Sequence, residues 1–463
     1  MPSVRLVDVA LPEFGMPEMR PEISAATYAN RLSRLRDRTK AAGFATLVVY
    51  ADREHFANMA YLVEFEPRFE EALLILAEGR TPLILTGPEN TGRARAAKVE
   101  ADVITYPPFG LLGQDRRNTP ALAELLRSAG IARGTTVGVI GWKYFSASES
   151  PAPDAWLDVP SYIADTLRAV VGESGRVANA TAILMDSTEG LRSTNEIDQI
   201  AQFEFSACHV SEAIKRLLFG MRPGMREYEA ARLMGQIALP LACHPMLSSG
   251  PRAYFGLESP SDKLIERGDP VTMAYGVWGA LTARAGWLVE DAGELPASIA
   301  DYVERLAAPY FACAAEWYET IGIGVPGGAI DALVRRHLGD PFFGLALNPG
   351  HLIHLDEWMN TPIYPGSEER LRSGQAIQID IIPATGSAYF TTNIEDGVAL
   401  LDERGRDEFK ERHPDAWSRI AARRAFMGDV LGIRLKPEVL PLGNIPGYLP
   451  PFLLAPRRAF VRR

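Results

Sequence analysis

The stretches that decide the fold are Ser-Gly-Gln-Ala-Ile-Gln-Ile-Asp (373–380) and Asn-Ile-Glu-Asp-Gly-Val (393–398). Polar and apolar residues alternate from Ala376 to Ile382, which predicts a strand with one face in a core. A second strand is predicted from Thr391 to Leu401.

Outward from this pair, the second half of the chain shows a repeated pattern. Strands are predicted around 270–278, 281–290, 376–382 and 391–401, and long helices at 195–218 and 299–320. Pro-Gly turns at 223–224 and 326–327 each come directly before a further helix. Paired helices and paired strands, each repeated, indicate an α+β domain with internal pseudo-duplication.

The first half has a different pattern. A helix is predicted over 27–44, and short apolar runs predict strands at 45–50, 72–77, 82–85 and 137–140. Helices that alternate with apolar strands are typical of an α/β domain. We expect three parts: 1–180, an N-terminal α/β domain; 181–430, a catalytic-like domain; and 431–463, a C-terminal extension.

Composition limits the possible functions. The chain has 463 residues, 47% of them hydrophobic, and a net charge of −10 from 48 basic and 58 acidic residues. The charges are scattered, which argues against nucleic acid or anionic lipid as a partner. No apolar run is long enough to cross a membrane, and three cysteines form no disulfide framework or metal motif. We therefore expect a cytoplasmic protein.

Seven motifs occur in the order found in one superfamily. Besides the two strands quoted first, they are 191–197 (LRSTNEI), 222–227 (RPGMRE), 248–253 (SSGPRA), 266–271 (ERGDPV) and 349–354 (PGHLIH). Together they resemble the pita-bread domain of the creatinase, prolidase, aminopeptidase P and methionine aminopeptidase superfamily. The first half, with Tyr-Leu-Val-Glu-Phe (61–65), resembles the creatinase/prolidase N-terminal domain. The fold class expected is therefore α+β, a C-terminal pita-bread domain with an N-terminal α/β creatinase/prolidase-type domain.

The resemblance also places the metal ligands of the family. Its two aspartates, one histidine and two glutamates fall here on Ala274, Ala285, His351, Asp380 and Glu395. Alanine has no donor atom, and two ions roughly 3.5–4 Å apart need several bridging oxygens. We therefore expect no two-metal centre, and the chain is interpreted as a divergent member that lacks the metal-binding aspartates.

Two histidines of the family peptidases are also replaced, by Leu257 and Trp358. These four losses favour an enzyme that is not a peptidase. The prediction is a metal-independent hydrolase or lyase of the creatinase-like type, which cleaves a C–N or C–C bond by acid/base catalysis. The aromatic residues around the changed positions favour a compact, aromatic or apolar substrate.

In this interpretation His351 transfers the proton, because imidazole titrates near neutral pH. Asp380 or Glu395 orients it, as a carboxylate does in catalytic triads. Arg68 lies where creatinase carries an arginine that reaches toward the substrate. The predicted substrate-binding residues are Arg68, Tyr254, Arg284, Trp287, His354 and Trp358. Arg284 has an alternative role in pairing with Asp380.

Neither a metal nor a cofactor is expected in this interpretation. Two alternatives remain open: an inert homologue that binds a ligand or a protein, and a hydrolase with a single metal. The expected partner is a small-molecule substrate, with no nucleic acid and no membrane. The resemblance further implies a homodimer.

Overall fold

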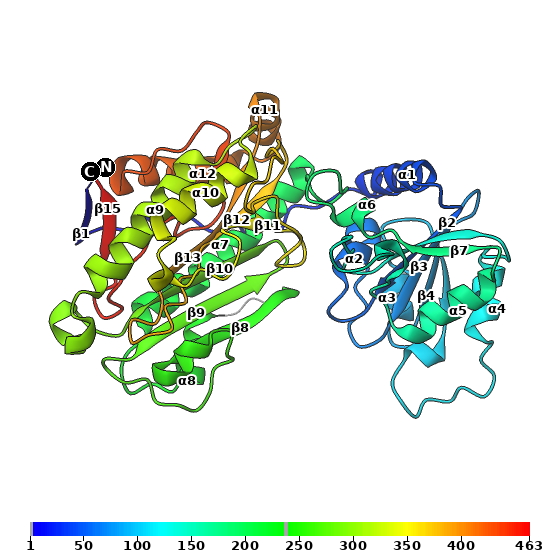
Figure 1. The fold of residues 1–463 in the computed structure, drawn as a ribbon, viewed down its shortest axis with the longest axis horizontal. Coiled ribbons are helices and arrows are strands. Elements are labelled where there is room, and N and C mark those ends of the chain that lie inside the picture. Colours follow the sequence, from blue (N-terminus) through cyan, green and yellow to red (C-terminus); the bar gives the residue numbers. More distant parts are fainter. Residues whose placement is uncertain (1–2, 236–238) are drawn as a thin grey trace. The chain divides into compact units, whose positions relative to one another are not determined.

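The computed structural model describes residues 3–235 and 239–463 and divides into two compact units (Figure 1). One unit is formed by Ile23–Ser193. The other contains Thr194–Arg463 together with the first residues of the chain, up to Glu22. The predicted fold class, an α/β domain followed by a pita-bread domain, is confirmed. The sequence did not indicate that the N-terminal segment belongs with the C-terminal unit.

The N-terminal unit is built on a six-stranded mixed sheet in the order β5-β4-β3-β2-β6-β7. Its strands are β2 (Thr46–Ala51), β3 (Ala72–Ala77), β4 (Leu83–Thr86), β5 (Asp102–Thr105), β6 (Thr136–Ile140) and β7 (Arg176–Asn179). Its helices are α1 (Ala25–Ala41), α2 (Ala57–Val63), α3 (Thr91–Ala94), α4 (Leu122–Ser128), α5 (Ser161–Val171) and α6 (Ala182–Met185). Every residue of β2 and β3 is buried, as expected for central strands covered on both faces.

The C-terminal unit is built on a seven-stranded sheet in the order β11-β12-β13-β10-β9-β8, with β14 also paired to β13. Its strands are β8 (Leu241–Ser249), β9 (Pro270–Val277), β10 (Ala280–Trp287), β11 (His351–Leu352), β12 (Ala376–Asp380), β13 (Asn393–Leu400) and β14 (Val439–Pro441). Its helices are α7 (Ile197–Gly220), α8 (Glu227–Ala231), α9 (Ala308–Thr320), α10 (Gly327–Leu338), α11 (Glu403–Arg412) and α12 (Pro414–Ala425). Helix α7 packs against β9 and β10, and Figure 1 shows α9, α10 and α12 beside the sheet. None of the helices in the described ranges combines the length and apolarity that a membrane span requires.

The turns before α8 and α10 share a backbone conformation, but the second one is centred on Gly324 and not on the predicted Pro-Gly pair 326–327. Gly224 and Gly324, after α7 and α9, have φ angles of +89° and +83°. Their N–H groups donate to Ile265 and Leu371, each at 2.8 Å. Positive φ costs glycine little, which explains why both turns contain it.

The C-terminal extension is part of the fold. β15 (Arg458–Arg462) pairs antiparallel with β1 (Val4–Asp8), and β14 pairs with β13. The N–H of Trp287 on β10 donates to the carbonyl of Pro451 at 3.0 Å. The two ends of the chain therefore form one small sheet, and the segment between β14 and β15 packs along the strands that carry the site.

Candidate metal centre

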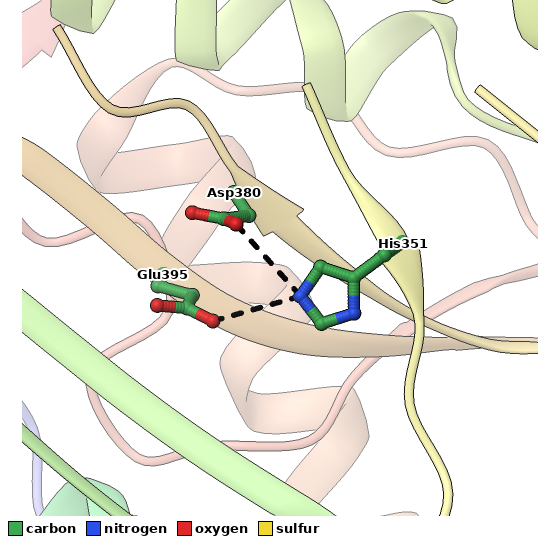
Figure 2. A group of neighbouring side chains, drawn as sticks. All are labelled: His351, Asp380 and Glu395. Carbon is green, nitrogen blue, oxygen red and sulfur yellow. Dashed lines mark ion pairs between the residues drawn. The ribbon is translucent and has the colours of Figure 1, made fainter. Parts of the chain in front are cut away.

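Three strands bring one histidine and two carboxylates to the same face of the large sheet (Figure 2). Asp380 ends β12 and lies directly opposite Glu395 on β13. His351 begins β11 and pairs with Gln378, two positions before Asp380. Because side chains alternate along a strand and paired residues share a face, the three functional groups converge.

The geometry of this group suits a cation. His351 Nε2 lies 3.9 Å from Asp380 Oδ2 and 3.8 Å from Glu395 Oε1. The ligand atoms of the three residues all lie within 4.8 Å of one another. His351 Nδ1 lies 3.2 Å from the carbonyl of Leu352, and an N–H donated there leaves the lone pair of Nε2 directed into the group.

Two buried atoms of the group have no hydrogen-bond partner, His351 Nε2 and Asp380 Oδ1. Leaving a buried polar atom unsatisfied costs about 1–3 kcal/mol, so such atoms call for an explanation. A divalent ion between the imidazole and the carboxylates would satisfy both atoms. The residues present therefore fit a single metal ion.

The pKa values in the group indicate an excess of negative charge. Burial lowers the pKa of His351, but contacts with the carboxylates of Glu357 and Glu395 outweigh it and raise the pKa to about 10. Burial raises the pKa of Asp380 to about 6, although the charge of His351 opposes the shift. The pKa of Glu395 is raised well above its usual value by burial and by Asp380. A positive charge placed among these groups would be stabilised.

Next to the group lies a cavity of about 370 Å³. Ala283 on β10 pairs with Ala274 on β9 and with Glu395 on β13, so beside Glu395 this face carries only methyl groups. Ala285, one of the positions that the resemblance assigned to a ligand, pairs with Asn393. The cavity is lined by Met246, Ala253, Tyr254, Gly256, Leu257, Thr272, Met273, Ala274, Ala283, Arg284, Leu347, Ile382, Pro383, Ala384, Thr385, Gly386, Phe390, Thr391, Asn393 and Glu395.

Aromatic side chains form one wall of this cavity. Tyr254, predicted to bind substrate, lines it and meets Phe390 edge to face at 5.7 Å. Leu257 and Phe390 have φ angles of 51° and 57°, which non-glycine residues rarely adopt and which often occur at binding sites. Trp287 is buried behind this wall and meets Phe390 edge to face at 5.7 Å. It supports the wall and is absent from the cavity lining.

Arg284 is held by the protein itself. Its Nε donates to Tyr448, its Nη1 to the carbonyls of Ala283 and Glu395, and its Nη2 to Asp396 and Ile445. These contacts account for all five N–H donors of a guanidinium. Arg284 therefore has no N–H left for the substrate binding that was predicted for it. In the alternative role Arg284 was expected to pair with Asp380, but it pairs with Asp396 at 2.8 Å.

The remaining predicted binding residues lie elsewhere. Trp358 stacks on His351, with ring centroids 4.1 Å apart and planes inclined by 17°. His354 is buried edge-to-face against Phe203, and its Nδ1 accepts from the N–H of Leu355. Arg68 belongs to the N-terminal unit, where it pairs with Glu66 at 3.1 Å. Roles of these residues in substrate binding remain predictions.

Sequence reasoning missed Glu357. Its Oε1 lies 3.2 Å from His351 Nε2, closer than either predicted carboxylate. No periodic pattern or motif spacing indicates this residue, because a loop that turns back on itself brings it to the site.

Comparison with known proteins agrees with this architecture. The model of the Creatinase/Prolidase N-terminal domain family matches residues 31–170. The uncharacterized peptidase YqhT of Bacillus subtilis (strain 168) is 24% identical over 251 residues, which cover 50% of this chain and 69% of that protein. A prolidase from Thermococcus sibiricus superposes with a TM-score of 0.64 at 18% identity, over 81% of this chain and 95% of its own. An Xaa-Pro dipeptidase from Bacillus anthracis has a TM-score of 0.59 at 16% identity, over 82% and 96%.

Residues 31–170 match the Creatinase/Prolidase N-terminal domain family, and the chain shares its fold with the prolidase and the Xaa-Pro dipeptidase. The solved structures show a shared fold, since their sequence identities are low. Their names, like that of the Bacillus subtilis relative, are those of peptidases.

These findings contradict the prediction of a metal-independent hydrolase or lyase that is not a peptidase. The prediction rested on four missing side chains, two metal ligands and two histidines, and it assumed that no metal could bind without them. In the structure, directly paired strands still bring His351, Asp380 and Glu395 together, which is enough for one ion. The expectation of a site without metal is therefore replaced by the proposal that follows.

Proposed function

We propose that this protein is a hydrolase of peptide or closely related amide bonds that works with one divalent ion. The observation that carries the proposal is the buried group His351, Asp380 and Glu395, whose ligand atoms all lie within 4.8 Å of one another. Glu395 also lines the cavity, so an ion held by the group would adjoin the space for a substrate. Such an ion would polarise an amide carbonyl as a Lewis acid.

The cavity supports an amide substrate with an apolar group. Its walls are largely aliphatic and aromatic, which favours an apolar side chain next to the scissile bond. The buried Oδ1 of Asn393 has no hydrogen-bond partner, and Asn393 lines the cavity. This oxygen is available to accept an N–H from the substrate. The peptidase names of the relatives favour the same class of bond.

The residues that line the cavity favour a site for one ion over a site for two. Ala274 and Ala283 leave the face beside Glu395 without donor atoms, and Ala285 adds none. The homodimer, which the family resemblance implies, and the cytoplasmic location, which the composition predicts, are part of this proposal.

Metal content and hydrolysis test the proposal together. Protein freed of metal with a chelator and titrated with Mn²⁺ or Zn²⁺ is expected to bind one ion per chain by calorimetry. The loaded protein is expected to cleave members of a panel of Xaa-Pro dipeptides, other apolar dipeptides and N-acyl amino acids, and a chelator should stop the cleavage. Absence of binding at millimolar ion, or an ion without effect on any amide, would favour an inert binding protein and reject the proposal.

The number of ions should change when the missing ligands are restored. The double variant Ala274→Asp/Ala285→Asp is expected to raise the bound metal from one to two ions per chain, measured by plasma mass spectrometry at saturating Mn²⁺. New carboxylates beside Glu395 would supply the oxygens that paired ions need, and the adjoining cavity leaves room.

The matched control is Ala274→Asn/Ala285→Asn, which adds similar volume without charge and should still bind one ion. A folded aspartate variant that also keeps one ion would contradict the assignment of these two positions.

A further inference from the structure

The segment after β11 folds back over the strand that it leaves. The N–H of Leu352 donates to Asn360 at 2.7 Å, and the N–H of Met359 donates back to Leu352 at 3.0 Å. Inside this loop the N–H of His354 donates to the carbonyl of Asp356 at 3.1 Å. These hydrogen bonds fold the loop back on itself. Residues 357 and 358 therefore lie near the beginning of β11, where His351 is located.

Two consecutive side chains of the loop then contact one imidazole ring. Glu357 places Oε1 3.2 Å from Nε2, while Trp358 covers the face of the ring at 4.1 Å. The stacked indole restricts rotation of the imidazole, and Nδ1 is directed to the Leu352 carbonyl. Nε2 is therefore directed into the space between Glu357, Asp380 and Glu395.

Glu357 also acts electrostatically on the rest of the face. Its charge contributes to raising the pKa of Asp380 to about 6, after burial and against the opposing charge of His351. Burial, followed by the charges of Glu357 and Glu395, raises the pKa of Cys243 on β8 to about 12.

We propose that Glu357 is a fourth ligand of the ion, a carboxylate supplied by the loop in place of the carboxylates missing at Ala274 and Ala285. The inference rests on the proposed ion site. One imidazole and three carboxylates form a donor set that suits divalent ions such as Mn²⁺. The ligand oxygen comes from the loop after β11, whereas the family positions Ala274 and Ala285 lie on β9 and β10.

Glu357 differs from the other ligands in its contact with solvent. Its side chain is 26% exposed, whereas His351, Asp380 and Glu395 are almost completely buried. Because Glu357 keeps contact with water, moving its carboxylate away from the ion costs less than moving a fully buried ligand.

Calorimetry with Mn²⁺ on the full chain tests this role. Glu357→Gln is expected to weaken binding by about 100-fold with one ion still bound, because a neutral amide replaces a charged ligand, and residues that only support a ligand account for about 10–100-fold. Glu357→Asp should retain more affinity than Glu357→Gln. The control Glu368→Gln makes the same chemical change at an exposed residue and should bind Mn²⁺ like the unaltered protein. In the Co²⁺-loaded protein, the visible absorption bands should shift in Glu357→Gln and remain unchanged in the control.

The outcomes separate this inference from the proposed function. If Glu357 contacts His351 but not the ion, the Co²⁺ spectrum of Glu357→Gln should stay unshifted, and that result would overturn the inference while the ion site stands. If the unaltered protein binds no ion, both proposals fail. A lower affinity together with a shifted spectrum supports the ligand role, provided that the metal-free variant melts at the temperature of the unaltered protein.

Discussion

Replacing His351 by alanine is expected to weaken binding of a divalent ion by at least about 100-fold and to abolish ion-dependent amide hydrolysis. Mutation of a residue that only supports a metal ligand lowers the metal affinity about 10–100-fold. Loss of a nitrogen that contacts the ion directly should lower the affinity by about 100-fold or more. A 100-fold loss corresponds to about 2.8 kcal/mol of binding free energy. His351 is the one nitrogen ligand of the group, so no other side chain there replaces it.

The measurement is a titration of chelator-treated protein with Zn²⁺ and Mn²⁺, followed by hydrolysis of the best substrate of the panel. His337→Ala is a suitable control, because His337 contacts Glu316 and is not part of the group. Thermal unfolding of both variants without metal separates lost binding from lost structure. Ion affinity unchanged in a folded His351→Ala protein would show that the ion is bound elsewhere.

Arg284→Met is expected to destabilise the protein by about 3–5 kcal/mol, the usual loss when one partner of a buried ion pair is removed. Arg284 and Asp396 are both almost completely buried, and their contact at 2.8 Å is supported by the carbonyls of Ile445 and Tyr448. Without the guanidinium, Asp396 would retain only Tyr318 and the N–H of Gly447 as hydrogen-bond donors.

Urea unfolding of the two proteins measures this difference. The double variant Arg284→Met/Asp396→Leu should be more stable than Arg284→Met, because replacing both charges by apolar groups leaves no buried charge without a partner. A single variant with normal stability but a raised KM would instead restore Arg284 as a substrate-binding residue.

The sequence predicted the strands of the site well. The strand expected around 270–278 is β9, and those expected at 376–382 and 391–401 are β12 and β13. Local alternation and short apolar runs are sufficient for such predictions, because they depend on neighbours in the chain. Only the motifs indicated that His351, Asp380 and Glu395 form one site. In the structure, the register of β11, β12 and β13 brings the three side chains together.

Other residues were misjudged because their environment comes from distant segments. The acceptors of Arg284 include carbonyls of the C-terminal segment, far along the chain from β10. Trp287 is buried against Phe390 and Tyr302 and does not line the cavity. An arginine or a tryptophan next to a motif looks the same in the sequence whether it faces a cavity or a core.

The sequence by itself determined the strands of the site, the resemblance to the pita-bread fold and the absence of donor atoms at Ala274 and Ala285, since each depends on residue type and local order. Only the tertiary structure decided what the remaining residues form. Strand register placed Glu395 between Asp380 and the methyl groups of the cavity, and a returning loop brought Glu357 and Trp358 to the His351 ring. The physical reason is that a metal site depends on distances of a few ångströms between side chains that the chain carries far apart.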